Sequence, residues 1–210
     1  MFKVEAIPPK ETYEWLLYKH YAKRIPSISY SYGLYQDCVL KGVCTFGKPA
    51  SPALCIGVMG QEFKDRVTEL NRLCVECDKK NITSWFVSRC IKMLPKPMCI
   101  VSYADTAQGH IGKIYQACNF VYTGLSDRHI EWYIEDSNKH SRHIPKISVR
   151  GDEWKSRERP RKHRYIYFIG SKKEVKEMRR ALRYPICDYP VGVTKRYDAS
   201  YNPITQGLLL

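Results

Sequence analysis

The chain has 210 residues and a formal net charge of +14, from 35 Lys and Arg against 21 Asp and Glu. Its 44% hydrophobic and 12% aromatic content excludes a disordered chain. No apolar run approaches the roughly 18 residues of a membrane span, and the start, MFKVEAIPPKE, lacks the apolar core of a secretory signal. Nine scattered cysteines do not have the spacing of a disulfide framework, so we expect a reducing, cytoplasmic setting.

The first half of the chain predicts a helix, a hairpin and a strand–helix unit. Residues 11–24 have acidic residues early, basic residues late and apolar residues on one face, which is typical of a helix. Residues 30–47 form two short apolar runs around a polar turn and predict a hairpin. A Gly- and Pro-rich loop, 47–53, follows. Residues 67–75 then predict a strand and 81–94 a helix.

The second half predicts strands and helices in alternation. Residues 98–105 form a nearly continuous apolar run that fits a buried strand. The later elements are a helix at 106–119, strands at 120–126, 129–136 and 164–170, and a basic helix at 172–183. This order predicts an α/β fold in which helices flank both faces of a mixed sheet.

Positive charge is concentrated in one region of the sequence. Residues 139–183 contain 16 Lys and Arg against 5 Asp and Glu, whereas the rest of the chain has 19 against 16. We therefore divide the chain into a core, 1–138, a basic segment of the same domain, 139–183, and a C-terminal arm, 184–210. Such a segment indicates that the protein binds a polyanion, and nucleic acid is the leading candidate. The alternative is a charged surface that is merely exposed to solvent. The cations that we assign to DNA are Arg157, Arg159, Arg161, Lys162 and Arg164.

Asp105, at the end of the predicted strand 98–105, is the first candidate catalytic residue. Open α/β sheets hold their ligands outside the carboxyl ends of strands. Gly109, His110 and Gly112 follow it and predict backbone amides that could hold an anion or a substrate carbonyl. The alternative is that Asp105 caps the next helix, a role that Asp often has.

Other polar residues have an ordinary interpretation beside a functional one. His20 is either a proton acceptor or metal ligand, or a histidine at a helix C-terminus. Tyr115 is either an acid or a core aromatic residue. Arg72 lies within an apolar strand pattern, so it must reach solvent or find an acidic or phosphate partner. Ser84 is a suitable first-turn residue of its helix.

Several metal and catalytic motifs are missing from the sequence. The single CxxC, Cys74–Cys77, has no second pair, so we expect no structural zinc site. No P-loop, HExxH, GxSxG or zinc-deaminase pattern is present.

Four blocks of sequence resemble a known family. HYAKRIP (20–26), ELNRLCV (69–75), SWFVSRCIKML (84–94) and VSYADTAQGHIGKIYQACNFVYTG (101–124) are similar, in this order, to the Mom DNA-modification proteins of bacteriophages. The resemblance extends from about His20 to Tyr133 and more loosely to Arg183. It implies the Gcn5-related acyltransferase (GNAT) fold, a central mixed sheet flanked by helices, here with a basic C-terminal extension.

The resemblance also implies a reaction and its residues. A small acetamide-type (carbamoylmethyl) group would be placed on the exocyclic amine of adenine in DNA and would block host restriction enzymes. DNA would be double-stranded or locally opened, and a homodimer is left open. The matching catalytic positions are His20, Arg72, Ser84, Asp105 and Tyr115. We assign substrate or cofactor binding to Tyr21, Asn71, Gly109, His110 and Gly112.

The donor of the transferred group is not identified by the sequence. Acetyltransferases of this superfamily use a QxxGxG-like loop, whereas the corresponding stretch here, 76–84, has no glycine. This puts acetyl-CoA in doubt. Lys79 and Lys80 could attract phosphates of coenzyme A, of an aminoacyl-tRNA end or of DNA. Iron, a consideration for the family, has no clear metal triad here.

Asp105 has a defined role in the mechanism that we expect. It would accept a proton from the attacking amine of a flipped base, relayed by His20 or Tyr115, while Arg72 or the amides near Gly109 would stabilise negative charge. Two other classes of protein remain open: a DNA-binding module without catalysis, and an acyltransferase that acts on a protein or a small amine.

Overall fold

The computed structural model describes residues 1–134 and 154–193, and their core is a seven-stranded mixed sheet. Only β4 and β5 pair in parallel; the other neighbours are antiparallel. In spatial order the strands are β1 (Phe2–Ala6), β2 (Tyr30–Gln36), β3 (Val39–Gly47), β4 (Val67–Val75), β5 (Met98–Asp105), β9 (Lys162–Ile169) and β6 (Val121–Leu125). A separate antiparallel ribbon pairs β7 (His129–Ile134) with β8 (Trp154–Arg159).

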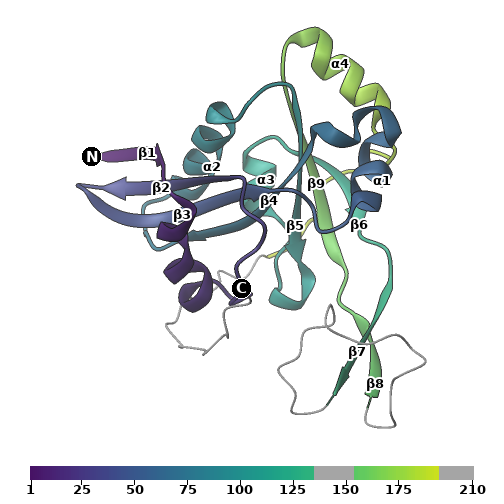
Figure 1. Cartoon of the computed structure of the whole chain (residues 1–210), viewed down its shortest axis with the longest axis horizontal. Helices are drawn as coiled ribbons and strands as arrows, with labels where there is room; N and C mark the ends of the chain where they lie inside the picture. The colour runs from purple at the N-terminus through teal and green to yellow at the C-terminus, as the bar shows by residue number, and fades with distance from the viewer. Residues whose placement is uncertain (135–153, 194–210) are drawn as a thin grey trace.

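Helices cover both faces of the sheet, as strand alternation requires. In β5, Ile100 and Ala104 belong to a core that includes Phe86 of α2, whereas Cys99 and Val101 belong to a second core on the opposite face. The helices are α1 (Pro52–Phe63), α2 (Ile82–Met93), α3 (Lys113–Ala117) and α4 (Lys172–Ala181). Residues of α3 pack against the first core, the one that includes Phe86. The second core includes residues of α1 and α4. Figure 1 shows α4 and the β7–β8 ribbon at opposite ends of the molecule.

The predicted mixed α/β sheet is confirmed, and two helices differ from the prediction. The first is helical from η1 (Pro9–Thr12) to η2 (Trp15–Lys19), where it ends in a π-helical turn, so His20 lies just beyond it. The helix predicted at 106–119 is split into η4 (Thr106–Gln108) and the five-residue α3. Gly109 and Gly112 separate the two, with φ angles of +66° and +79°, because left-handed residues cannot continue a helix.

The sequence patterns missed β1, α1 and β8. The predicted loop 47–53 includes the first two residues of α1, and no element was predicted for residues 54–66. Pro52 is in fact the first helical residue, where its missing N–H costs nothing. Gly60 breaks the regular geometry with a φ of +70°.

The predicted domain division falls partly outside the described residues. Residues 135–153, which contain the predicted division at 138, and residues 194–210 of the arm are not described. The first part of the arm lies along β6: Cys187 bridges Tyr122, and the Tyr189 hydroxyl donates a hydrogen bond to the Phe120 carbonyl at 2.6 Å. The division itself stays a prediction.

The parallel pair β4–β5 determines where side chains can converge. The two strands are paired from Val67 to Leu70 against Cys99 to Ser102, and their pairing stops there. Beyond Leu70, β4 continues beside β3, and beyond Ser102, β5 continues beside β9. The two strands therefore separate beyond Leu70 and Ser102, and polar side chains from the ends of both strands can lie in the space between them.

Candidate active site

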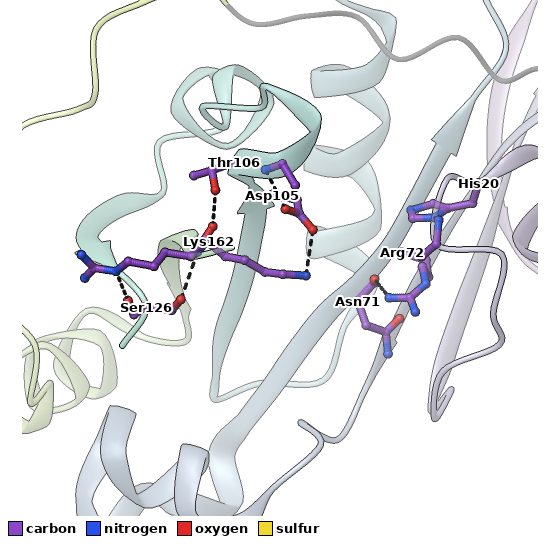
Figure 2. A network of polar contacts seen from close by, with 10 residues as sticks. His20, Asn71, Arg72, Asp105, Thr106, Ser126 and Lys162 are labelled. Carbon is purple, nitrogen blue, oxygen red and sulfur yellow. Dashed lines mark hydrogen bonds and ion pairs between the residues drawn. The ribbon is translucent and has the colours of Figure 1, made fainter. Parts of the chain in front are cut away.

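Six polar side chains meet beyond the point where β4 and β5 stop pairing. They come from the segment after η2, from β4, from the end of β5 and the turn that follows it, and from the start of β9. We call them the Asp105 cluster: His20, Tyr21, Arg72, Asp105, His110 and Lys162. Figure 2 shows four of them, His20, Arg72, Asp105 and Lys162. The His20 and Tyr21 rings stack at 4.4 Å, and Tyr21 meets His110 edge-on at 5.8 Å.

Asp105 has two partners and two functions in the fold. One carboxylate oxygen, Oδ1, accepts a hydrogen bond from the Ala107 N–H at 3.0 Å, so the predicted helix cap is confirmed at η4. The other, Oδ2, lies 3.1 Å from Nζ of Lys162. The Asp105 side chain remains 14% exposed. The carboxylate is thus fixed in position and still reachable from outside the protein.

His20 is a neutral hydrogen-bonding group rather than a base. It is buried, and its Nδ1 accepts a hydrogen bond from the Ala22 N–H at 3.0 Å, which places the ring proton on Nε2. Burial, followed by the positive charges of Arg72, His110 and Lys162, lowers the pKa of His20 from 6.5 to about 3. A group with so low a pKa is a weak proton acceptor, so the predicted relay through His20 is not favoured.

Tyr21, a member of the cluster, and Tyr115 of α3 both keep their protons. Burial and then the charge of Asp105 raise the pKa of Tyr21 to about 12. Burial also raises the pKa of Tyr115 above its ordinary value, although a hydrogen bond with Ser102 opposes this. The Tyr115 ring packs against Phe120 and Tyr165 at 5.4 Å and 5.3 Å. Tyr115 is therefore a core aromatic residue with a hydroxyl that can act as a donor.

Arg72 and Asn71 hold the chain that leads out of the first helix. The Arg72 guanidinium donates to the Asn71 carbonyl at 2.6 Å and to the Arg24 carbonyl at 3.4 Å. The Asn71 amide donates to the Ser27 carbonyl at 2.8 Å and accepts from the Thr45 hydroxyl at 2.6 Å. Asn71, predicted to bind substrate, thus uses its side chain to attach this segment to the sheet.

The turn after β5 differs from the prediction of available backbone amides. The Gly109 N–H donates to the Thr106 carbonyl at 3.0 Å, and the His110 N–H donates to the Asp105 carbonyl at 3.1 Å. These two amides are engaged inside the turn and do not support the predicted charge stabilisation by amides near Gly109, which stays a prediction. Gly112 has a packing role: a Cβ atom there would lie 2.3 Å from the Tyr165 ring.

Ser84 is not part of the Asp105 cluster. Its hydroxyl donates to the Asn81 carbonyl at 3.0 Å in the first turn of α2, and its carbonyl accepts from the Cys118 thiol at 3.3 Å. The catalytic role that the resemblance implies for Ser84 stays a prediction.

The segment between β4 and α2 differs from the glycine-rich loop that holds coenzyme A in acetyltransferases. The segment between β4 and α2 lacks glycine, and the Lys79 ammonium lies over the Phe2 ring at 4.8 Å. A backbone cradle for a coenzyme A pyrophosphate does not fit this arrangement.

Within 1–134 and 154–193, no group of three His, Cys, Asp or Glu side chains could hold a metal ion. In the same ranges, no helix is long and apolar enough to cross a membrane.

The five cations assigned to DNA lie in different environments. Arg157 and Arg159 are exposed on β8. Arg161 donates through Nε to the Ser126 carbonyl at 2.6 Å. Arg164 is only 5% exposed and donates to the Thr123 hydroxyl at 3.0 Å, with Tyr184 over its guanidinium at 3.3 Å. Burial excludes Arg164 from a surface contact with DNA, which corrects that prediction.

The sequence analysis did not predict that Lys162 lies in the candidate active site. It was assigned to DNA as part of a basic run, whereas the structure pairs it with Asp105. The antiparallel register of β5 and β9, which sets Asp105 opposite Lys162, explains the contact. The predicted strand began at residue 164, so no local sequence pattern could have indicated this pair.

Solved acetyltransferases are similar to the chain at low identity. An N-acetyltransferase from Staphylococcus aureus Mu50 is 13% identical, with a TM-score of 0.46 over 80% of this chain and 98% of that one. The putative acetyltransferase yncA from Salmonella typhimurium, solved with its cofactor acetyl-CoA, is 10% identical, with a TM-score of 0.47 over 81% and 95%. Because both TM-scores lie below 0.5, we infer neither an activity nor a cofactor from these likenesses.

Sequence similarity is more specific. The chain is 30% identical over 128 residues to the methylcarbamoylase mom of Escherichia phage Mu, and the match spans 56% of this chain and 53% of that protein. It thus spans about half the length of the curated relative. The Mom protein family matches residues 1–191. This match includes all six residues of the Asp105 cluster, and the chain belongs to the Mom protein family.

Proposed function

We propose that this protein is a DNA-modifying transferase that attaches a carbamoylmethyl group to the exocyclic amine of adenine in phage DNA. The modified base would then resist host restriction enzymes. The observation that carries the proposal is the Asp105 cluster itself, an accessible carboxylate among two cations and protonated donors, in a chain of the Mom protein family. The name of the phage Mu relative, methylcarbamoylase, supports the chemical class of the group.

The reaction needs a proton acceptor beside the amine. The lone pair of adenine N6 is delocalised into the ring, so the nitrogen is a poor nucleophile until a proton is removed. As N6 forms a bond to the electrophilic carbon of the donor, the leaving group departs with its electron pair and the N6 proton passes to Asp105. Lys162 and the Ala107 N–H hold the carboxylate in place for this transfer.

The neighbours of Asp105 can stabilise negative charge that develops on the donor. Arg72 supplies a cation, and Tyr21 supplies a hydroxyl that stays protonated because its pKa is raised to about 12. His20 supplies an Nε2–H, since its Nδ1 is occupied by the Ala22 N–H. Donors already fixed by the fold act without reorganisation during the reaction. The target base has to leave the helical stack to reach them.

Asp105→Asn tests this assignment. Asparagine keeps the shape of the side chain and an oxygen for the Ala107 N–H, but it cannot take up a proton. We expect the modification rate to fall by roughly 100-fold or more, while DNA affinity stays within about threefold. Nucleoside mass spectrometry of DNA from cells that express each variant measures the modification, and gel-shift titration measures binding. Equal loss of both properties contradicts the assignment.

A matched control is Asp65→Asn, the same chemical change at an exposed residue of η3 (Lys64–Arg66). It should modify DNA like the wild type. The same experiment separates the two other classes. Unmodified DNA with tight, salt-sensitive binding by the wild type indicates a DNA-binding module. Neither modification nor binding indicates an acyltransferase for a protein or a small amine.

A further inference from the structure

The β7–β8 ribbon has two chemically different faces. Residues directly opposite each other in an antiparallel pair share a face. His129, Glu131 and Tyr133 therefore share one face with their partners Arg159, Arg157 and Lys155. The other face carries Ile130, Trp132, Ile134, Trp154, Ser156 and Glu158. We call the first the cationic face and the second the apolar face.

Three cations follow each other at alternate positions along the cationic face. Lys155, Arg157 and Arg159 are all exposed, and alternate side chains of a strand are about 6–7 Å apart. Arg157 is held by two neighbours on the same face: its Nε lies 2.7 Å from Glu131, and its guanidinium lies 4.7 Å from the centre of the Tyr133 ring. Within 129–134 and 154–159, this face has one carboxylate against three cations, and the contacts of Arg157 partly preorganise the row.

The base of the ribbon is tied to the Asp105 cluster. The Thr106 hydroxyl, next to Asp105, donates to the Arg161 carbonyl at 2.5 Å. The Ser126 N–H donates to the Lys162 carbonyl at 2.7 Å, and the Lys162 N–H donates to the Ser126 hydroxyl at 3.0 Å. Figure 2 shows these bonds around the Asp105–Lys162 ion pair. The end of the ribbon nearest Arg159 is thereby attached to the strand end that carries Asp105.

We propose that the cationic face of the ribbon binds the phosphate backbone of duplex DNA next to the modified adenine, without reading its sequence. This deepens the proposed function and rests on it. A regular row of lysine and arginine side chains matches a regular row of phosphates, and such contacts position a protein on DNA while carrying no sequence information. Because Glu131 is the one acidic group among the described residues of this face, a duplex fits these residues better than a protein with mixed charges.

The length of the strand limits where the contacts fall. Lys155 precedes Lys162 by seven residues, so the chain between them spans at most about 25 Å. The long side chains add a few ångströms. The contacted phosphates should therefore lie within one helical turn, about 34–36 Å, of the modified base.

The test compares two triple variants that remove equal charge. In the ribbon variant, Lys155, Arg157 and Arg159 are replaced by serine. In the control variant, Lys172, Lys173 and Lys176 are replaced by serine; all three are exposed on α4, at the opposite end of the molecule (Figure 1). Duplex affinity is measured against NaCl concentration. Circular dichroism and thermal melting verify that both variants fold.

The ribbon variant should lose affinity on the order of 100-fold at 0.1 M salt, and the slope of log K against log salt should decrease by about 0.9 per lost contact. The loss should be equal for duplexes of different sequence. The control variant should stay within about threefold of the wild type. Phosphate ethylation interference should show contacts within one helical turn of the target adenine that the ribbon variant lacks.

Three results overturn the inference: equal losses in both variants, an unchanged salt slope in the ribbon variant, or a loss confined to one sequence or to single-stranded nucleic acid. The proposed function fails separately. If wild-type protein leaves adenine unmodified but the ribbon variant still loses duplex binding, only the catalytic proposal is wrong. If adenine is modified and the ribbon variant binds normally, only the ribbon proposal is wrong.

Discussion

His20 and Tyr21 set the charge of the Asp105 cluster by remaining neutral. The histidine, with a pKa of about 3, does not take up a proton at neutral pH, and the tyrosine, with a pKa of about 12, does not release one. Burial also lowers the pKa of His110. At neutral pH the charged members are therefore the carboxylate of Asp105 and the cations of Arg72 and Lys162. This excess of positive charge suits a reaction in which a leaving group becomes negative.

The buried neutral state of His20 predicts a pH-dependent stability. The unfolded chain takes up a proton on His20 below pH 6.5, whereas the folded chain does not until about pH 3. The free energy of unfolding therefore falls as the pH drops through this window, by at most about 1.4 kcal/mol per pH unit. Between pH 6.5 and 5.0, wild-type protein should lose up to about 2 kcal/mol more than His20→Asn, whose oxygen replaces Nδ1 as acceptor.

Urea denaturation at the two pH values measures this difference. The exposed His129 provides the control, since His129→Asn should keep the full pH dependence of the wild type. An identical pH dependence in the wild type and His20→Asn would show that His20 does not stay neutral in the folded protein.

At the scale of elements, the turn between η4 and α3 is fitted closely to β9. Gly112 lies against the Tyr165 ring, and the Tyr165 hydroxyl donates to the Ile111 carbonyl. This contact connects the turn that carries His110 to the strand that carries Lys162. The packing of the two elements thus fixes the positions of two members of the Asp105 cluster.

Two glycine substitutions separate steric contact from backbone strain. Gly112 and Gly124 both have positive φ angles, +79° and +82°, but a Cβ at Gly124 meets nothing within 4 Å. Gly124→Ala should cost about 1 kcal/mol or slightly more, and Gly112→Ala roughly 1–3 kcal/mol beyond that because the ring must move. Thermal melting should show a Tm lower by about 2–12 °C for Gly112→Ala than for Gly124→Ala. Equal Tm values would contradict the close contact.

Sequence patterns predicted the elements that have a strong local signature. The hairpin at 30–47, β4 and α4 follow from alternation, turn residues and charge pairs; Asp37 and Cys38 form the turn with φ angles of 48° and 68°. Patterns failed where tertiary contacts decide, as in α1. The same holds for the site: Asp105 was predicted from its place at a strand end, whereas its partner Lys162 depends on a register between strands 57 residues apart.

At the scale of the whole molecule, the described cations of the basic segment do not form a single patch. Arg157 and Arg159 lie on the ribbon beside the Asp105 cluster, while the cations of α4 lie at the other end. Among the described cations, those of the ribbon are connected to the Asp105 cluster and those of α4 are not, so local placement, rather than the net charge of +14, determines which cations can serve the reaction.

Access to a base within a duplex predicts a substrate preference. Extrusion of a paired adenine costs a few kcal/mol, and a mismatch reduces this cost. A duplex with the target adenine opposite a mismatched base should be modified at least about 10-fold faster at low substrate concentration, since each 1.4 kcal/mol corresponds to a factor of ten. Single-turnover assays with quantified nucleosides measure the rates. A mismatch moved by one helical turn is the control, and equal rates for matched and mismatched targets contradict base extrusion.

The tight turn between β2 and β3 has a practical consequence through its second residue. Cys38 lies exposed there, and Cys187 lies exposed beside β6, whereas four of the other seven thiols are fully buried among the core residues and one more, Cys118, is nearly so. Solvent-accessible thiols are the ones that oxidise in air during purification. Disulfide-linked oligomers formed through these two positions would be mistaken for a native oligomer. The oligomeric state should therefore be measured on a variant that carries Cys38→Ser and Cys187→Ser.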